Sequence, residues 1–175
     1  LYKDIEKHGG VPVMAAAGHS LIKKKMKETG ALLAGEMSGH ICFADNYYGF
    51  DDAIYAACRV LQIVAQSDKQ LSEMLVDLPK TAFTPEIRVD CPDDKKFEIV
   101  QELTENFREE YEVIDIDGVR VNFDGGWALI RASNTQPVLV LRFEAVSEER
   151  LKQLVAVIKK QMDNYKPLVQ FDYEP

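Results

Sequence analysis

A polar loop between two apolar, strand-like segments is the feature that most constrains the fold of this chain. Residues 131–137 read Arg-Ala-Ser-Asn-Thr-Gln-Pro, and the apolar run Val138–Phe143 follows directly. Short polar side chains between strands favour a tight turn, and Ser and Asn can bond the local backbone. A guanidinium adds a planar fork that suits phosphate or carboxylate. The loop therefore predicts either an ordinary turn or an anion-binding cradle formed by Arg131, Ser133, Asn134 and Thr135.

The rest of the second half places short strands between two helices. Ile87–Cys91 alternates apolar and polar residues, and Asp117-Gly118 is a favoured turn between two strands. Two runs repeat apolar residues at helical spacing: Phe97, Val100, Leu103 and Phe107, and later Leu151, Leu154, Val155, Ile158 and Met162. We therefore expect an α+β domain with a four-stranded antiparallel sheet and two flanking helices.

The first half combines helices with short strands. Residues 1–8 and the segment that starts at His19 have helical patterns, and glycines end both. Asp51 or Asp52 is a natural N-cap for the next helix. Further expected elements are strands at Val11–Met14, Ala31–Ala34 and Ile41–Ala44, a helical face of Ile54, Ala57, Cys58, Leu61 and Val64, and a short helix over Lys69–Leu78.

The pattern changes between Pro79 and Pro85, which we take as a domain boundary. The expected organisation is an α/β domain with a mixed sheet over residues 1–80 and the α+β domain over residues 81–175. The chain begins at Leu1 within a helical pattern, so we expect a fragment of a longer polypeptide.

Composition and charge exclude several classes of partner. The net charge is −8, with 9 basic and 10 acidic residues in the first 80 positions and 12 and 19 in the remainder. Without a basic stripe, nucleic acid is not an expected partner. No apolar run approaches the roughly 18 residues of a membrane span, so no membrane association is expected either. Three widely spaced cysteines without a CxxC motif favour reduced, buried thiols in a cytoplasmic protein.

A second polar loop, Gly35–His40, carries three side chains suited to a sugar. Two glycines allow a sharp turn that brings Glu36 and Ser38 together. A carboxylate and a hydroxyl match sugar hydroxyls, which both donate and accept hydrogen bonds. His40 titrates near neutral pH and could exchange a proton with a hydroxyl. The alternative is a helix-capping Glu beside a surface His.

Together, three motifs in this order resemble the α-D-phosphohexomutase family. They are Gly35-Glu-Met-Ser-Gly-His40, Tyr48-Gly-Phe-Asp-Asp52 and Arg131-Ala-Ser-Asn-Thr-Gln-Pro137. The resemblance covers essentially the whole chain, as the third and fourth domains of that family. Met37 is similar to the bacterial phosphomannomutase/phosphoglucomutase branch, whereas phosphoglucosamine mutases, the nearest alternative within the family, typically carry Gln there.

The resemblance implies a function for both loops. Members of the family interconvert hexose 6-phosphate and hexose 1-phosphate through a phosphoserine enzyme, Mg²⁺ and a bisphosphorylated hexose intermediate. By match, Glu36 and Ser38 would bind sugar hydroxyls, His40 and His19 would assist proton movement, and Arg131, Ser133, Asn134 and Thr135 would bind phosphate. The partners implied are a phosphorylated hexose and the N-terminal domains of the same polypeptide.

The sequence departs from the family pattern in two respects. It contains neither the reactive serine loop nor the aspartate-rich metal loop, so no metal ligand is assigned and the chain alone is expected to be inactive. Asp115-Ile-Asp-Gly118 is assigned to a hairpin instead. Ala15–Ala17 stand where relatives usually carry a basic residue and a threonine. A non-catalytic module that binds sugar phosphates is therefore a competing hypothesis from another class.

Overall fold

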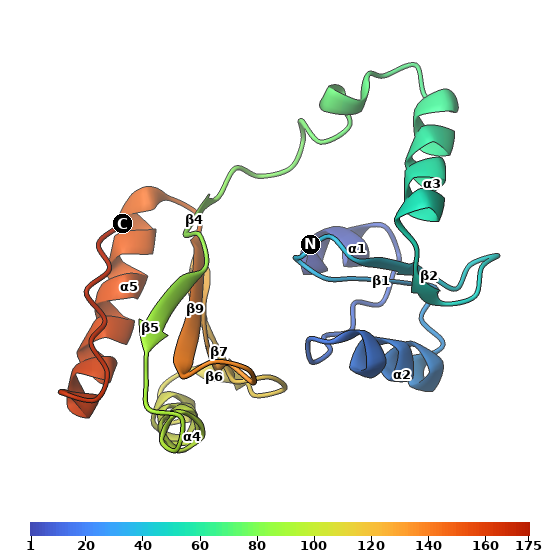
Figure 1. Ribbon diagram of the computed structural model, residues 1–175. Helices are drawn as coiled ribbons and strands as arrows, with labels where there is room; N and C mark the ends of the chain where they lie inside the picture. The colour runs from blue at the N-terminus through green and yellow to red at the C-terminus, as the bar shows by residue number, and fades with distance from the viewer. The chain divides into compact units, whose positions relative to one another are not determined.

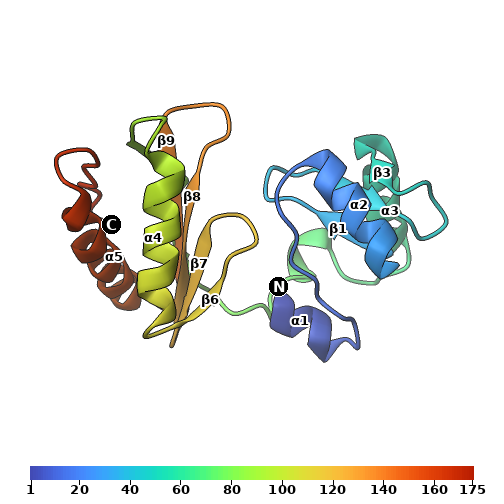
Figure 2. The same ribbon diagram turned by 90° about the horizontal axis from the view of Figure 1, so that it is seen from below.

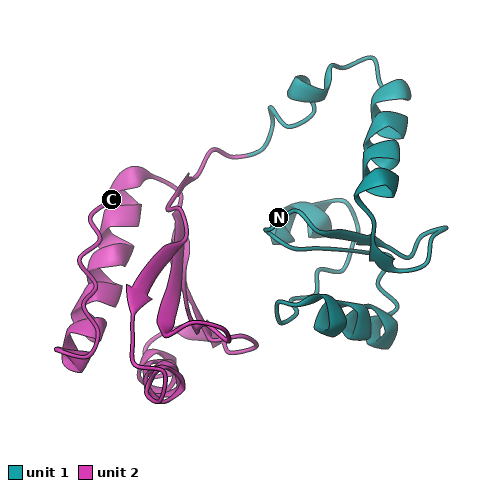
Figure 3. Cartoon of the chain, viewed as in Figure 1, with its two compact units in different colours: residues 1–78 teal, residues 79–175 magenta.

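The structure is a computed structural model that describes residues 1–175 (Figure 1). The chain divides into two compact units, Leu1–Leu78 and Pro79–Pro175 (Figure 3). We refer to them as unit 1 and unit 2.

Unit 1 contains three helices and a small sheet. The sheet has three strands in the order β1-β2-β3, and both pairs are antiparallel. Its elements are α1 (Tyr2–Lys7), α2 (His19–Thr29), β1 (Leu33–Gly35), β2 (Ile41–Phe43), β3 (Phe50–Asp51), α3 (Ala53–Ala65) and the 3₁₀ turn η1 (Leu71–Glu73).

Local signals set the ends of the unit 1 helices. Gly30 follows α2 in the left-handed conformation, and the N–H of the next residue, Ala31, donates to the carbonyl of Met26 at 3.1 Å. The Asp52 carboxylate accepts the N–H of Tyr55 and caps the start of α3. Both features agree with the sequence prediction, because they depend on residues within one helical turn.

Three expectations for unit 1 need correction. Val11–Met14 forms no strand, and Lys69–Leu78 contains only the one turn η1. An apolar run favours burial but does not determine which strand it pairs with. In this structure the segment has no strand partner, and Val11 is exposed. The sheet is antiparallel rather than mixed, because the loops between its strands are shorter than the crossover that a parallel pair requires.

The buried face of α3 also differs from the expected one. Ile54, Cys58 and Leu61 are exposed, while Ala56 is the buried residue of the helix. The prediction that all the cysteines are buried is therefore wrong for Cys58, although Cys42 and Cys91 are buried and all three thiols are free. Periodicity identifies an apolar face, but only a neighbouring element can cover it.

Unit 2 is an antiparallel sheet with two helices. Its sheet has six strands rather than the four expected, because β4 and β5 both pair with β9. The elements are β4 (Ala82–Phe83), β5 (Ile87–Asp90), α4 (Lys96–Arg108), β6 (Glu112–Ile114), β7 (Val119–Phe123), β8 (Gly126–Ala132), β9 (Val138–Ala145), α5 (Glu148–Met162) and the 3₁₀ turn η2 (Asp163–Tyr165). The predicted combination of two α- and β-containing domains is confirmed.

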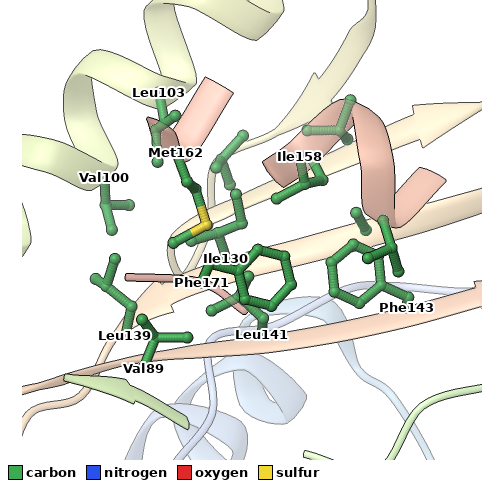
Figure 4. Packing of buried hydrophobic residues seen from close by; sticks show 14 of the residues in the cluster. Val89, Val100, Leu103, Ile130, Leu139, Leu141, Phe143, Ile158, Met162 and Phe171 are labelled. Atoms are coloured by element: carbon green, nitrogen blue, oxygen red, sulfur yellow. The ribbon is translucent and has the colours of Figure 1, made fainter. Parts of the chain in front are cut away.

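One face of the unit 2 sheet carries α4 and α5 (Figure 2). Alternate residues of β7, β8 and β9 point into the core, where Ile130 and Leu141 meet Leu103 of α4 and Ile158 of α5 (Figure 4). The side-chain period of two along a strand places every second residue on the helix-covered face. The sheet and its two helices therefore form one core.

The predicted apolar stripe of α4 contains one error. Phe97 is 57% exposed, whereas Lys96 and Ile99 are buried. The error is confined to the first turn of α4, because the remaining stripe residues, Val100, Leu103 and Phe107, are buried as expected.

None of the helices combines the length and the apolar composition that a membrane-spanning segment requires.

Candidate functional site

The loop between β1 and β2 is a tight hairpin connection. The N–H of Glu36 donates to the carbonyl of His40 at 2.9 Å, and the N–H of Gly39 donates to the carbonyl of Glu36 at 3.0 Å. Gly39 has a φ of +92°, a conformation that glycine adopts without steric cost. These constraints bring Glu36 and Ser38 together on one small loop, as the sequence predicts.

The Glu36 carboxylate is fixed at the start of α2. Its Oε1 accepts the N–H of Gly18 at 2.8 Å, and the Ser38 hydroxyl lies 3.5 Å from its Oε2. A negative charge at a helix N-terminus is stabilised by the unpaired N–H groups there. Both roles predicted for Glu36 are therefore compatible. Its carboxylate accepts the N–H of Gly18, the N-cap residue of α2, and offers oxygen atoms beside Ser38.

His40 is oriented by a residue that the sequence analysis did not assign to the site. Its Nδ1 lies 2.6 Å from Oδ2 of Asp51 in β3, and Oδ1 of Asp51 accepts the N–H of Ile41 at 3.1 Å. An ionised carboxylate only accepts hydrogen bonds, so Nδ1 is the donor to Asp51, and in a neutral imidazole with this tautomer Nε2 is the acceptor. The hydrogen bond from His40 lowers the pKa of Asp51.

His19 completes this cluster from the first residue of α2. Its ring centroid lies 4.4 Å from that of His40, and its Nε2 lies 4.0 Å from Oε2 of Glu36. We call His19, Glu36, Ser38 and His40, with Asp51 behind them, the unit 1 cluster. His19, Glu36 and His40 each offer one potential metal-ligand atom, and these atoms lie within 4.8 Å of one another.

Ala15–Ala17 lie directly before Gly18, the residue that Glu36 binds. Their methyl groups neither donate nor accept hydrogen bonds. Polar contacts of this segment with a ligand would therefore come from its backbone alone.

In unit 2, Arg131 is paired with an acid instead of standing alone. Its Nη1 donates to Oδ2 of Asp117 at 3.2 Å, and both side chains are about 30% exposed. The turn at Gly118 makes this possible, since a Cβ atom there would lie only 2.5 Å from the Cβ of Arg131. Asp115 is likewise paired, with Arg108 at 2.6 Å. The predicted hairpin is present, since β6 and β7 pair antiparallel on either side of residues 115–118.

Ser133 organises the turn of the polar loop. Its buried hydroxyl accepts the N–H groups of Thr135 and Gln136 at 3.3 and 3.2 Å. Ser133 thus bonds the local backbone, as the sequence predicts, and the N–H groups of Thr135 and Gln136 are directed at its hydroxyl. The side chains of Asn134 and Thr135 are exposed at the tip of the loop.

Two basic residues that are not part of this loop donate hydrogen bonds to its residue Gln136. The sequence analysis assigned neither of them to the site. Lys96 is 3% exposed, and its Nζ donates to the carbonyl of Gln136 at 3.1 Å and to Asp93 at 2.6 Å. Arg88 donates to the side-chain carbonyl of Gln136. The one sequence signal for Lys96 was its spacing of three and four residues from Ile99 and Val100, which places it on the apolar face of α4.

Two family profiles match nearly the whole chain. The one described as phosphoglucomutase/phosphomannomutase, alpha/beta/alpha domain III, matches residues 1–82. The one described as phosphoglucomutase/phosphomannomutase, C-terminal domain, matches residues 86–161.

Individual proteins give the same result. The chain is 50% identical over 159 residues to a phosphomannomutase/phosphoglucomutase of Pseudomonas aeruginosa, covering 90% of the chain and 34% of that protein. It is 46% identical to a phosphoglucomutase of Neisseria gonorrhoeae, covering 86% of the chain and 33% of that protein.

A crystal structure of a phosphoglucomutase/phosphomannomutase family protein from Burkholderia thailandensis superposes with a TM-score of 0.83 at 37% identity, covering 98% of the chain and 36% of that protein. The chain thus spans about a third of the length of these relatives. Since both family profiles and these individual relatives agree over most of the chain, the chain belongs to the phosphoglucomutase/phosphomannomutase family.

Proposed function

We propose that this chain is the sugar- and phosphate-binding part of a phosphohexomutase that interconverts hexose 6-phosphate and hexose 1-phosphate, with mannose or glucose as the hexose. The observation that carries the proposal is the unit 1 cluster, in which a fixed carboxylate, a hydroxyl and two imidazoles lie together. Relatives named phosphomannomutase/phosphoglucomutase and phosphoglucomutase support this substrate class.

The unit 1 cluster supplies the hydrogen-bonding groups that a hexose needs. Glu36 accepts from sugar hydroxyls, and Ser38 both donates and accepts. His40 accepts a proton at Nε2 while Asp51 holds its Nδ1 proton and stabilises the resulting cation. His19, whose ring touches that of His40, assists this proton movement.

The polar loop of unit 2 binds the phosphate that is not transferred. Arg131 exchanges its single hydrogen bond with Asp117 for a bidentate interaction with the doubly charged phosphate. Asn134 and Thr135 add neutral donors from the exposed tip, and Ser133 keeps the turn in shape. Lys96 and Arg88 fix the far end of the loop at Gln136.

Phosphoryl transfer itself is assigned to the rest of the parent polypeptide. Mg²⁺ prefers several oxygen ligands, whereas the one cluster of potential ligands here contains two imidazoles. The residues of this cluster therefore do not fit Mg²⁺. We propose that the N-terminal domains of the parent supply the phosphoserine and the metal, and that a bisphosphorylated hexose is the intermediate.

We also propose that the protein is cytoplasmic, because free cysteines are typical of reducing compartments.

A binding experiment tests whether Arg131 contributes to phosphate binding. Replacing Arg131 by Met weakens binding of glucose 1-phosphate by about 1.5–3 kcal/mol, the size of a charged hydrogen bond. The matched control is Arg108→Met, which removes an exposed arginine paired with Asp115 and leaves affinity unchanged. Unchanged affinity of the Arg131 variant would show that the loop is only a turn.

The sugar role of Glu36 has its own readout. Glu36→Gln weakens binding of glucose 1-phosphate more than binding of inorganic phosphate. Equal effects on both ligands contradict a role in sugar recognition. Robust mutase turnover by the purified chain, without a complementing fragment, would overturn the division of roles.

Ala15–Ala17 favour a second candidate, a non-catalytic module that binds sugar phosphates, because three methyl groups precede the residue that Glu36 holds. Incubating the parent protein with glucose 1-phosphate and assaying for glucose 6-phosphate distinguishes the two, since binding without conversion supports the module. Phosphoglucosamine mutase activity is distinguished in the same assay with glucosamine 1-phosphate.

A further inference from the structure

Three side chains of the unit 1 cluster form the ligand set of a transition-metal site. His19 comes from the start of α2, and Glu36 and His40 come from the β1–β2 loop. One ligand atom of each lies within 4.8 Å of the other two. Two imidazole nitrogens and one carboxylate oxygen, with a fourth position left open, are a ligand set used by zinc enzymes.

The groups behind these ligands strengthen the assignment. His40 donates Nδ1–H to the Asp51 carboxylate at 2.6 Å, which leaves Nε2 as the nitrogen available to a metal. Zinc-bound histidines usually have such a carboxylate partner, because it fixes the tautomer and raises ligand basicity. Glu36 is held by the N–H of Gly18 through Oε1, which leaves Oε2 facing His19. Two of the three ligands are therefore oriented before a metal arrives.

The geometry requires only a small closure. A tetrahedral ion with ligand bonds of 2.0–2.2 Å holds its ligand atoms about 3.3 Å apart. The ligand atoms must therefore approach one another by about 1.5 Å at most. His19 can supply this movement by rotating about its side-chain bonds, since its side chain is 53% exposed and that of Glu36 only 15%.

We propose that His19, Glu36 and His40 bind Zn²⁺, or a similar nitrogen-preferring divalent ion such as Co²⁺, and that the bound ion prevents sugar binding. The nitrogen-rich ligand set selects zinc over Mg²⁺ or Ca²⁺, which favour oxygen. The ion uses the Glu36 carboxylate that the proposed function assigns to sugar hydroxyls. The competition therefore rests on the proposed function, whereas metal binding does not.

Metal binding is tested on the chain without sugar. Titration with Co²⁺ produces visible absorption bands whose intensity reports a four-coordinate site, and Zn²⁺ abolishes them by displacement. The expected result is saturation at one ion per chain, with Mg²⁺ causing no displacement. His40→Ala and His19→Ala each weaken Co²⁺ binding by more than about 10-fold, and Asp51→Asn weakens it by about 10–100-fold through the lost hydrogen bond.

Two controls use the other potential ligands of the chain. His8 is exposed and lies 3.8 Å from Asp4, so it is a matched histidine–carboxylate pair outside the cluster. Cys58 is an exposed free thiol. His8→Ala and Cys58→Ser leave Co²⁺ affinity unchanged. Loss of binding in either control, with the His19 and His40 variants unaffected, overturns the proposal.

A measurement on the unmodified chain covers the case of misfolded variants. The ring nitrogens of His19 and His40 shift in nitrogen NMR spectra on addition of Zn²⁺, while those of His8 do not. Shifts confined to His8, or none at all, overturn the site.

The competition is tested separately with glucose 1-phosphate. Added sugar phosphate lowers the apparent Zn²⁺ affinity, and Zn²⁺ lowers the apparent affinity for the sugar phosphate by the same factor. Zinc binding that glucose 1-phosphate leaves unchanged overturns the competition. Sugar binding in a chain that does not bind zinc overturns the metal site and leaves the proposed function standing.

Discussion

Unit 1 and unit 2 differ in how they hold their polar loops. Unit 2 has a continuous core of 22 buried residues, whereas the core cluster of unit 1 consists of Ile22, Met26 and Cys42. The apolar face of α3 in unit 1 is exposed at Ile54 and Leu61. In unit 1 the polar side chains are instead held by hydrogen bonds, since Glu36 accepts the N–H of Gly18 and Asp51 binds both His40 and the N–H of Ile41.

The comparison shows two ways to orient the side chains of a site. In unit 1, hydrogen bonds orient them on a small core, whereas in unit 2 the loop is anchored to a large core. Burying one aliphatic side chain contributes about 1.5–3 kcal/mol. We therefore expect unit 2 to be the more stable unit and its loop to keep its shape when unit 1 opens.

The largest expected effect tests whether the core accounts for this difference. Leu103→Ala removes a side chain with 0% exposure and should lower the free energy of unfolding by about 2–5 kcal/mol. Denaturant unfolding followed by circular dichroism reports both units, and the fluorescence of Trp127, the one tryptophan of the chain, identifies the transition of unit 2. Leu61→Ala on the exposed face of α3 should change stability by less than about 0.5 kcal/mol. Similar losses in both variants would contradict the comparison.

The second effect contrasts two glycines with nearly the same backbone conformation. Gly30 and Gly118 have φ values of +69° and +79°, but only at Gly118 would a Cβ atom clash, with Ile130 and Arg131. Alanine in the left-handed conformation costs about 1–2 kcal/mol at either position. Gly118→Ala should cost more than this and weaken phosphate binding, because the turn lies against Arg131. Thermal unfolding followed by circular dichroism measures both variants, and equal losses would contradict the expected clash.

The third effect compares adjacent lysines. Lys96→Met leaves the carbonyl of Gln136 without its buried donor and should cost about 1–3 kcal/mol. Lys95 makes an exposed ion pair with Glu98 at 2.7 Å, so Lys95→Met should cost less than about 1 kcal/mol. Denaturant unfolding gives both values, and phosphate affinity should fall only in the Lys96 variant. Retained affinity there would show that the loop needs no anchor.

The smallest effect concerns a partly buried hydrogen bond in unit 1. The Tyr47 hydroxyl donates to Asp52 at 2.7 Å, which lowers the pKa of Asp52 and raises the pKa of Tyr47 to about 12. The stabilisation from Asp52 is present above its unfolded pKa and is lost as the pH falls through its folded pKa. Tyr47→Phe should raise the pKa of Asp52 in a carbon NMR titration. An unchanged pKa would mean that the backbone N–H groups of Tyr55 and Ile54, and not Tyr47, lower the pKa of Asp52.

Several elements followed from local sequence alone. Gly30, Asp52 and the Asp117-Gly118 turn act through neighbours within a few residues, so their roles could be predicted without a fold. The conformation of Val11–Met14 and the buried face of α3 could not be predicted in this way. Apolar residues favour burial, but the local sequence does not determine which neighbouring element covers them. Phe97 was assigned to the core of α4 for the same reason.

Of the candidate site, the sequence determined the two polar loops and the side chains that they present. Glycines and short polar residues set the turn at Glu36 and the turn at Ser133, and the motifs identified the family. The tertiary structure alone decided that Asp51 orients His40, that Glu36 binds Gly18, and that Lys96 rather than Lys95 supports the loop at Gln136. These partners lie 11 to 40 residues apart in the chain. Strand register and helix packing bring them together, and short-range sequence patterns do not encode either.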